Sequence, residues 1–478
     1  MVAIEFQAKT MQERRGIPIL GLAPEIQKRG GLVPILQEVH REQIEQGLPA
    51  ICKLLVAGNT LVYLGEPDLI GEMFHRPTTF DKPGKLYHPL RDFMVDHGLI
   101  SAQHPQWLVQ RQHARGIFAG RFMQDYSEVI STVAGEIIMQ HLDNTKPGEL
   151  VDMDVLLGRA TSLALVRCMF NVQSGERPIS EDDLNVIVEK LDIAFNYSFA
   201  AFFTPPFMRI MIRSMKKEYE LACREVKIIL TNTVRRYMDY IDRNAIAAPW
   251  DIVSTFIIDG LSAPDPKDRI TFEEVCGNVL SFVVAGFDTT KSLIKTNLRC
   301  LWQYPQERQK VMNEIVSVLG TKSPSFADLT KMPTLDHFVD EALRYECPTS
   351  SPVREAVEDT ILGGYPIAKG TMILLCQHIA HHDERFWSNP EVFDSSRFAR
   401  EPKEPSNPFA YFPFAEGDRK CIGMGFAKME AKIMMVQILQ GGWSWTVTNP
   451  DAEGTHASTF QRPQTLQFER NRPGWLVL

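Results

Sequence analysis

The sequence lacks a segment typical of a membrane anchor or a secretion signal. Its first residues, MVAIEFQAKTMQERRG, contain no long apolar run, whereas a transmembrane helix needs about 20 predominantly apolar residues. We therefore expect no signal peptide, no transmembrane segment and no integral membrane anchor, and we expect a cytoplasmic location.

Closely spaced cysteine pairs are also missing. The chain has eight cysteines and no CxxC pair among them, which argues against a zinc site and against a disulfide framework. This cysteine usage favours a reducing compartment. The cysteines lie at Cys52, Cys168, Cys223, Cys276, Cys300, Cys347, Cys376 and Cys421.

The chain has no excess of positive charge and no obvious linker. Its 51 Lys and Arg residues are outnumbered by 59 Asp and Glu residues, giving a net charge of −8, which argues against nucleic acid as the main partner. It also has no Gly/Ser tract, no repeat and no long block of one charge. Although 478 residues could make about three domains, we expect a single domain over residues 1–478.

What the chain does contain is a dominant helical period. Amphipathic helices are predicted over residues 125–143, 152–170, 181–203 and 215–243. Short strand-like runs occur at residues 54–65 and 361–375 and in the C-terminal segment TLQFERNRPGWLVL. The pattern predicts a mainly α protein with a small β portion.

The longest predicted helix opens at Thr271 with a capping box closed by Glu274 and runs to about residue 303, before a Tyr-Pro pair. At 1.5 Å per residue it is roughly 50 Å long, enough to cross the molecule. Its centre is apolar nearly all round and contains the motif AGFDTT, residues 285–290. The motif has two interpretations: a packing glycine beside a polar pair, or a groove for a small molecule with a proton relay beside it.

Several polar residues share helix faces. Glu341 and Arg344 lie three residues apart, and Trp107 and Arg111 lie four apart, so each pair projects from one side of its predicted helix. Arg397 follows in FDSSRF. Each of these spacings is common by chance when taken alone.

Residues 411–425 read YFPFAEGDRKCIGMG. The stretch from Phe414 to Gly423 resembles the haem-binding loop of the cytochrome P450 family, FxxGxRxCxG. AGFDTT looks like the oxygen-binding helix of that family, and Glu341, Arg344 and Arg397 look like its structural triad. These signatures occur in the order of the family and cover nearly the whole chain.

The resemblance implies the cytochrome P450 fold, with haem b buried between the long central helix and the cysteine loop. Within the family, FDKPGKLYHPLRDF and DTILGGYPIAKG look most like the haem domain of soluble bacterial fatty-acid hydroxylases that are fused to a reductase. We expect no reductase domain in this chain. The residues that the resemblance assigns to haem binding are Trp107, Arg111, Arg354, Phe414, Arg419, Cys421 and Gly423, with Cys421 as the iron ligand.

The physical chemistry of the loop fits a thiolate ligand. We expect the dipole of the following helix to favour the Cys421 anion. Gly417 and Gly423 are expected to let the backbone turn so that N–H groups point at the sulfur, and Phe414 is expected to exclude water. The arginines would pair with the haem carboxylates, whereas Glu341, Arg344 and Arg397 are assigned to folding.

The implied activity is that of a haem-thiolate monooxygenase, which inserts one oxygen atom from O2 into a C–H bond. Electrons would come from NAD(P)H through a separate ferredoxin, flavodoxin or flavin reductase. Gly286 would make room for dioxygen, Thr289 would hold a proton-donating water network, and Asp288 would feed it. Arg115, Lys420 and Lys428 would make the docking face basic, unless they are scattered solvated charges.

Other activities on the same fold stay open. A peroxygenase is expected to lack the acid–alcohol pair that Asp288 and Thr289 form, and haem-thiolate isomerases or dehydratases tend to lose the threonine. A haem sensor without turnover is the alternative outside enzymes.

The predicted substrate is a sizeable hydrophobic molecule such as a fatty acid, a terpenoid or a steroid. Three phenylalanines repeat at helical spacing in the segment that the resemblance places over the pocket, and a Pro-Pro pair would end that helix. The residues expected to line the pocket are Phe195, Phe199, Phe202, Ala285, Thr349 and Ser350. Lys85, Tyr87 and His88 are candidates for anchoring a carboxylate.

Overall fold

The structure is a computed structural model. The residues that it describes are 9–16, 22–29, 31–84, 92–93, 98–118, 120–146, 148–170, 179–204, 206–244, 246, 251–349, 351–401, 404–449, 455–456, 460–461 and 464–470.

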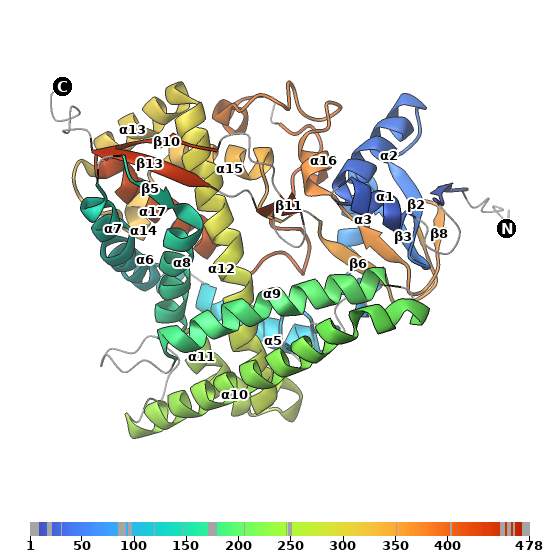
Figure 1. Ribbon diagram of the computed structural model, residues 1–478, viewed down its shortest axis with the longest axis horizontal. Helices are drawn as coiled ribbons and strands as arrows, with labels where there is room; N and C mark the ends of the chain where they lie inside the picture. Colours follow the sequence, from blue (N-terminus) through green and yellow to red (C-terminus); the bar gives the residue numbers. More distant parts are fainter. Residues whose placement is uncertain are drawn as a thin grey trace.

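Helices form most of the described structure. Figure 1 shows a large helical part through which α12 runs, and a smaller part where α1, α2 and α3 lie against strands. The α-helices are α1 Ala23–Lys28, α2 Val33–Glu45, α3 Pro67–Phe74, α5 Gln106–Arg115, α6 Gly120–Val133, α7 Gln140–Asn144, α8 Met153–Met169, α9 Glu181–Phe203, α10 Arg213–Arg243, α11 Ile252–Thr255, α12 Phe272–Gln303, α13 Pro305–Leu319, α14 Phe326–Leu329, α15 Pro333–Tyr345, α16 Gln377–His381 and α17 Met424–Gln440. The mainly α architecture predicted from the sequence is confirmed.

Local signals set the ends of the long helices. Thr271 accepts a hydrogen bond from the Glu274 N–H at 3.1 Å, and the Glu274 carboxylate accepts one from the Thr271 N–H at 2.6 Å, so the predicted capping box of α12 is confirmed. Ser180 caps α9 in a similar way through the Asp183 N–H. The predicted helix 125–143 begins earlier, at Gly120, and includes a π-helical turn, Ala134–Met139.

The largest sheet has six strands in the order β1-β2-β3-β9-β6-β4. The strand-like run predicted over residues 54–65 falls on β2 and β3, which pair as an antiparallel hairpin, and β3 pairs in parallel with β9. The strands are β1 Gln12–Arg14, β2 Ile51–Val56, β3 Asn59–Leu64, β4 Phe80–Asp81, β5 Leu150–Asp152, β6 Val353–Ala356, β7 Thr360–Leu362, β8 Tyr365–Ile367, β9 Met372–Leu374, β10 Trp443–Val447, β11 Thr455–His456, β12 Phe460–Gln461 and β13 Thr465–Arg470.

Side chains that alternate along these strands bury both faces of the sheet. Leu54 and Leu61 join a core that includes α2, whereas Val62 and Ile373 join a second core that includes Phe74 of α3. A third and larger core joins the helices, including α6, α8, α12 and α17. Both faces are therefore covered, and the sheet is held beside the helical part.

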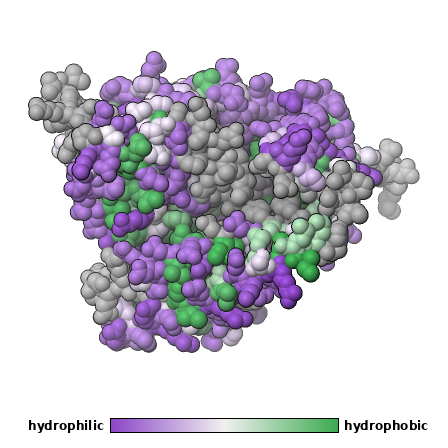
Figure 2. All heavy atoms as spheres, viewed as in Figure 1, coloured by the Kyte–Doolittle hydropathy of each residue, from purple (hydrophilic) through white to green (hydrophobic). Residues whose placement is uncertain are grey.

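α12 is the central helix of the larger core and packs against α8 and α17. Within the described part of the chain, Pro266–Gln303 is one segment that is long and apolar enough to cross a membrane, and 67% of its most apolar window is buried inside the protein. This burial is typical of a core helix. In Figure 2 the visible face is mostly polar, with apolar side chains in its lower part, where α9 and α10 lie.

Candidate active site

Cys421 lies in a tight loop that leads into α17. The Cys421 N–H donates to the Phe414 carbonyl at 2.9 Å, and the Lys420 N–H donates to the Gly417 carbonyl at 3.0 Å. Gly417 has a φ of +72°, and a Cβ there would lie 2.4 Å from the Phe74 carbonyl oxygen. Glycine is therefore required at 417 both by conformation and by space.

Gly423 does not have that requirement. Its φ is −88°, which any residue can adopt, and an added Cβ would meet only the Phe118 ring, at 4.0 Å. The expectation that both glycines make the turn is therefore wrong for Gly423. Its contribution is a backbone N–H that hydrogen-bonds Cys421 and lowers the pKa of the thiol.

The thiol of Cys421 differs from the other cysteines by being exposed, whereas the remaining seven are buried or half-buried. Protein atoms nevertheless surround the sulfur closely enough to raise the pKa of Cys421, because this burial outweighs the Gly423 N–H and the charges of Arg111, Lys82 and Lys420. The Gly423 N–H and the three cations act in the direction that favours the thiolate, and the expected effect of the helix dipole stays a prediction. A coordinated metal ion would lower the pKa of Cys421 further, since coordination deprotonates a thiol.

A group of cations lies near Cys421. Arg354 of β6 and Arg419 are buried, and Lys82 follows β4. Burial, Arg354 and Arg419 together hold the pKa of Lys82 well below its ordinary value, and both arginines act on it more strongly than Asp81 does. This part of the protein therefore favours an anionic ligand.

Asp81 is the acidic partner within this group. Its carboxylate forms an ion pair with Arg419 and accepts a hydrogen bond from the His104 N–H at 2.8 Å. Sequence reasoning missed both Asp81 and Lys82. No sequence signal marked this pair, because the pKa of Lys82 depends on Arg354 and Arg419, which lie far along the chain.

Trp107 and Arg111 form the α5 side of the same group. The Arg419 guanidinium lies 4.2 Å from the centre of the buried Trp107 ring, and that of Arg111 lies 5.9 Å from it. Arg111 donates to the Lys420 carbonyl at 2.6 Å, while its Nε is buried without a hydrogen-bond partner among the described residues. A buried donor of this kind is satisfied by an added acceptor.

These residues fit a haem. A thiol at a helix N-terminus can ligate iron, and the cations can hold the haem carboxylates. Phe414 packs against the main core beside this loop. The residues that would hold the group are Lys82, Trp107, Arg111, Arg354, Phe414, Arg419 and Cys421.

α12 has an accessible stretch in the middle of a buried helix. Its residues are buried continuously from 274 to 283 and again from 290 to 301, whereas 284 to 289 keep accessible surface and Ala285 is exposed. The Thr289 hydroxyl donates to the Ala285 carbonyl at 2.7 Å. This stretch is the candidate ligand-facing surface of the helix.

Gly286 faces a neighbouring helix. A Cβ on Gly286 would lie 2.8 Å from a Leu165 methyl group of α8. The geometry therefore supports the packing interpretation of this glycine, and the expectation that Gly286 makes room for dioxygen is not supported.

Asp288 forms an ion pair with Lys291, one turn further along α12, at 2.7 Å. Sequence reasoning placed Asp288 beside Thr289 and missed Lys291, although a lysine three residues after an aspartate on a helix is a local signal for such a pair. Asp288 is thus held by a cation of its own helix.

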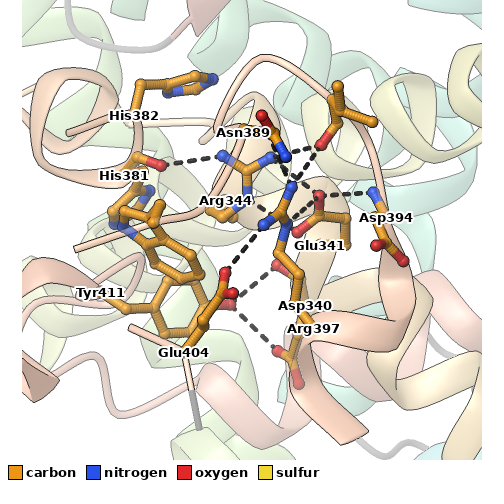
Figure 3. Close-up of polar contacts among 12 residues, drawn as sticks. Asp340, Glu341, Arg344, His381, His382, Asn389, Asp394, Arg397, Glu404 and Tyr411 are labelled. Atoms are coloured by element: carbon orange, nitrogen blue, oxygen red, sulfur yellow. Dashed lines mark hydrogen bonds and ion pairs between the residues drawn. The ribbon is translucent and has the colours of Figure 1, made fainter. Parts of the chain in front are cut away.

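The predicted triad forms a buried network (Figure 3). Arg344 binds the Glu341 carboxylate through Nε and Nη2, both at 2.8 Å, and Arg397 Nε lies 3.2 Å from it. The exposed fractions of these side chains are 0%, 0% and 2%. The two arginines also donate to backbone carbonyls, including that of His381, so the network joins α15 to the segment before the cysteine loop.

The structure tests the expected pocket only in part. α9 ends at Phe203 and a 3-10 helix begins at Pro206, as the Pro-Pro pair predicts. The Thr349 hydroxyl donates to Gln377 at 2.7 Å, so this group is already used inside the protein. The side chains of Phe195, Phe199, Phe202, Phe203 and Phe207, and residues Lys85, Tyr87, His88 and Ser350, lie outside what the structure describes.

Two of the three cations expected on the docking face are paired. Lys420 binds Glu416 at 2.8 Å, and Lys428 binds Asp340 at 2.9 Å, while Arg115 is exposed. The interpretation as a basic face is therefore not supported for Lys420 and Lys428, because neighbouring carboxylates offset their charge.

Comparison with known proteins gives consistent findings. The family model described as cytochrome P450 matches residues 11–460. The chain is 27% identical to "Cytochrome P450 3A11" of Mus musculus, over 73% of this chain and 71% of that protein, and 25% identical to "Cytochrome P450 4B1" of Homo sapiens, over 90% and 84%. The structure resembles the crystal structure of the cytochrome P450DA heme domain with a TM-score of 0.81 and 22% identity, covering 98% of this chain and 99% of that one.

Proposed function

The chain belongs to the cytochrome P450 family, and on this basis we propose a substrate class, a proton path and an electron source for it. It is an oxidoreductase, a cytochrome P450 monooxygenase that uses haem. When bound, haem supplies the redox chemistry that activates dioxygen, and a thiolate ligand donates electron density to it. The remaining roles below belong to side chains of this chain.

The binding roles follow from position. Cys421 is proposed as the iron ligand, since it is the exposed cysteine and its loop is fixed by Gly417. Lys82, Arg354 and Arg419 are proposed to hold haem carboxylates, because the two arginines disfavour the charged form of Lys82 until an added anion offsets them.

The proposed substrate is a sizeable hydrophobic molecule such as a fatty acid, a terpenoid or a steroid. The observation that carries this proposal is the accessible stretch of α12, where Val284 and the exposed Ala285 offer apolar surface. Burying one large apolar group of a ligand there would contribute roughly 1.5–3 kcal/mol.

Thr289 is proposed to position a proton-donating water beside this surface, and Asp288 to exchange protons with it. The Thr289 hydroxyl already donates to the Ala285 carbonyl, so its oxygen is free to accept a hydrogen bond from water. The presence of the acid and the alcohol favours the monooxygenase over a peroxygenase, an isomerase or a sensor.

Electrons are proposed to come from NAD(P)H through a separate ferredoxin, flavodoxin or flavin reductase. A cytoplasmic location also stays a prediction, and eight free cysteines are consistent with a reducing compartment.

The test is a screen for the change in haem absorbance that follows displacement of water from the iron. Long apolar compounds are expected to give large changes. Ala285→Phe is expected to weaken their binding about tenfold or more, which is about 1.4 kcal/mol, by filling the accessible stretch. Val316→Phe is the matched control, because Val316 is an exposed residue of α13.

Tight binding of small polar compounds, with no response to fatty acids, terpenoids or steroids, would refute this substrate class. A reduced carbon monoxide spectrum like that of a histidine-ligated globin would refute Cys421 as the ligand.

A further inference from the structure

Two side chains of α16 hold both backbone groups of Phe412, a residue that precedes the cysteine loop. The Phe412 N–H donates to His381 Nε2 at 3.1 Å, and the Phe412 carbonyl accepts from Gln377 Nε2 at 2.8 Å. Gln377 and His381 are four residues apart, so they lie on one face of α16. The N–H and the carbonyl belong to the planar peptide units on either side of Phe412. This pair, called the α16 clamp below, therefore restrains both units.

Each arm of the clamp is itself buried and held in place. The Gln377 side-chain oxygen accepts from the Thr349 hydroxyl at 2.7 Å, which leaves the amide nitrogen to donate to the Phe412 carbonyl. Arg344 of the buried triad donates to the His381 backbone carbonyl at 2.9 Å (Figure 3). The arms are thus positioned by groups from outside α16 as well as by the helix.

The His381 ring acts as a hydrogen-bond acceptor. Burial, together with the charges of His382, Arg344 and His378, holds the pKa of His381 well below its ordinary value, so the ring is neutral. A neutral imidazole has one donor and one acceptor nitrogen. Nε2 accepts from Phe412, and Nδ1 is buried without a hydrogen-bond partner among the described residues. The ring therefore directs its hydrogen bonding at the Phe412 backbone.

The restraint continues from Phe412 to Cys421 through the backbone. The Phe412 carbonyl also accepts from the Ala415 N–H at 2.9 Å, which closes a turn. Ala415 has a φ of +55°, a conformation that residues other than glycine seldom adopt and that its surroundings must hold. Within this turn, the Phe414 carbonyl accepts from the Cys421 N–H at 2.9 Å. The orientation of the turn thus places the acceptor for the cysteine backbone.

The Phe412 side chain supports the loop from a second side. It is fully buried, and its ring packs edge-on against Phe74 with the ring centres 5.9 Å apart. Phe74 also supplies the carbonyl oxygen that leaves room only for glycine at position 417. A shift of Phe412 would therefore disturb both the turn before Cys421 and the residue against which Gly417 packs.

We propose that Gln377 and His381 are positioning residues for the iron ligand, because through Phe412 they hold the Cys421 loop ready to keep its sulfur on haem iron. This inference rests on the proposed role of Cys421. A ligand held in place before it binds loses less conformational freedom on binding. Loosening the clamp should therefore weaken ligation while the helices stay folded.

The test uses the haem-loaded full chain in four variants. His381→Leu and Gln377→Met each remove one arm of the clamp. His381→Gln keeps a side-chain acceptor for the Phe412 N–H. Tyr237→Phe is the matched control, since it removes a buried hydrogen bond to Asp251, far along the chain from the cysteine loop.

Two signals are followed over one urea series. The first is the red-shifted Soret band that the reduced carbon monoxide complex shows when a thiolate ligates the iron, and the second is far-ultraviolet circular dichroism, which reports helix content. The interval between their midpoints measures how far ligation is lost before the helices unfold.

His381→Leu and Gln377→Met are expected to widen this interval, because the sulfur leaves the iron while the helices persist. His381→Gln is expected to restore most of the wild-type interval, and Tyr237→Phe to lower both midpoints without widening it. Transfer of haem to apomyoglobin is expected to be about tenfold faster or more in Gln377→Met, as is usual when a group that orients a metal ligand is lost.

If removing either arm lowers both midpoints equally, as in Tyr237→Phe, the clamp is merely structural and the inference is overturned. If His381→Leu cannot be isolated with haem, the interval in Gln377→Met decides alone by the same criterion. A wild-type Soret band like that of a histidine-ligated globin would instead refute Cys421 as the ligand. A thiolate-type band in wild type, with an unchanged interval in the clamp variants, would refute only the clamp.

Discussion

Glu341 and Glu430 are both almost fully buried, but their carboxyl groups meet different surroundings. Glu341 is bound by Arg344 and Arg397 and by the Asp394 N–H. Both carboxyl oxygens of Glu430, on α17, lack a hydrogen-bond partner among the described residues. Burial raises the pKa of Glu341, although Arg344 and Arg397 favour its ionised form. Burial raises the pKa of Glu430, which has no such cations, well above its ordinary value.

Replacing Glu341 by Gln is expected to lower the free energy of unfolding by about 3–5 kcal/mol, because two buried arginines lose their counter-ion. Glu225→Gln is the matched control, since Glu225 is half exposed and lies 3.5 Å from Lys190, and such pairs contribute less than about 1 kcal/mol. Urea unfolding of the two variants measures both values. Equal losses would show that burial of the triad has no energetic consequence.

Replacing Glu430 by Met is expected to stabilise the protein, and more so as the pH rises. The pKa of Glu430 is raised in the folded state, so above about pH 4.5 the unfolded chain releases a proton that the folded protein keeps. The stability of the wild type therefore falls as the pH rises toward the folded pKa, by up to about 1.4 kcal/mol per pH unit.

Thermal unfolding of wild type and Glu430→Met between pH 5 and pH 8 measures this difference. A difference that does not change with pH would contradict a protonated Glu430.

α12 shows how one element serves both packing and chemistry. Its Gly286 side packs on Leu165 of α8, whereas Ala285 is exposed and Asp288 and Thr289 keep accessible surface. Residues 100° apart on a helix face different neighbours, so a short motif can meet a helix on one side and a ligand on the other. The same motif thus contains a structural glycine and a chemical pair.

Gly286→Ala is expected to destabilise the protein through contact with Leu165. Overpacking of a core costs about 1–3 kcal/mol, and better helix propensity returns up to about 1 kcal/mol. Leu165→Val removes the contacting methyl groups, so the double variant should lose less stability than the sum of the two single variants. If urea unfolding showed that the two losses in free energy of unfolding simply add, position 286 would not contact Leu165.

At the scale of the whole molecule, the net charge does not predict where cations gather. The net charge is −8, yet cations gather at Lys82, Arg354 and Arg419, where they face the proposed haem carboxylates. Near the cysteine loop, Lys420 and Lys428 are paired with Glu416 and Asp340. The cations that the sequence suggested for partner docking are thus largely neutralised.

Electron transfer from an acidic ferredoxin is therefore expected to depend only modestly on salt. Strong electrostatic steering changes association rates by 10–10³-fold, and we expect less than about tenfold between low and high ionic strength, because paired lysines contribute little long-range attraction. Stopped-flow reduction over a salt series measures the effect. A steeper dependence, abolished in Lys428→Gln, would restore the basic-face interpretation.

The sequence by itself determined the features that neighbouring residues control. The capping box of α12 and both ends of α9 depend on groups within four residues of each other, and the loop around Cys421 is one contiguous motif, so each could be predicted without the fold. The family signature gave the triad before its geometry was known. Even the Asp288–Lys291 pair was open to prediction, since both residues lie on one helix turn.

Only the tertiary structure decided which distant groups meet. Arg419 contacts Ala102 across 317 residues of chain, and the pairing of Asp81 with Arg419, or of Lys295 with Asp154, depends on how β4, α8 and α12 pack. The packing of α8 likewise decided that Gly286 lies against Leu165. Charged residues have many possible partners in a sequence, and the packing of the core selects among them because burial makes an unpaired charge costly.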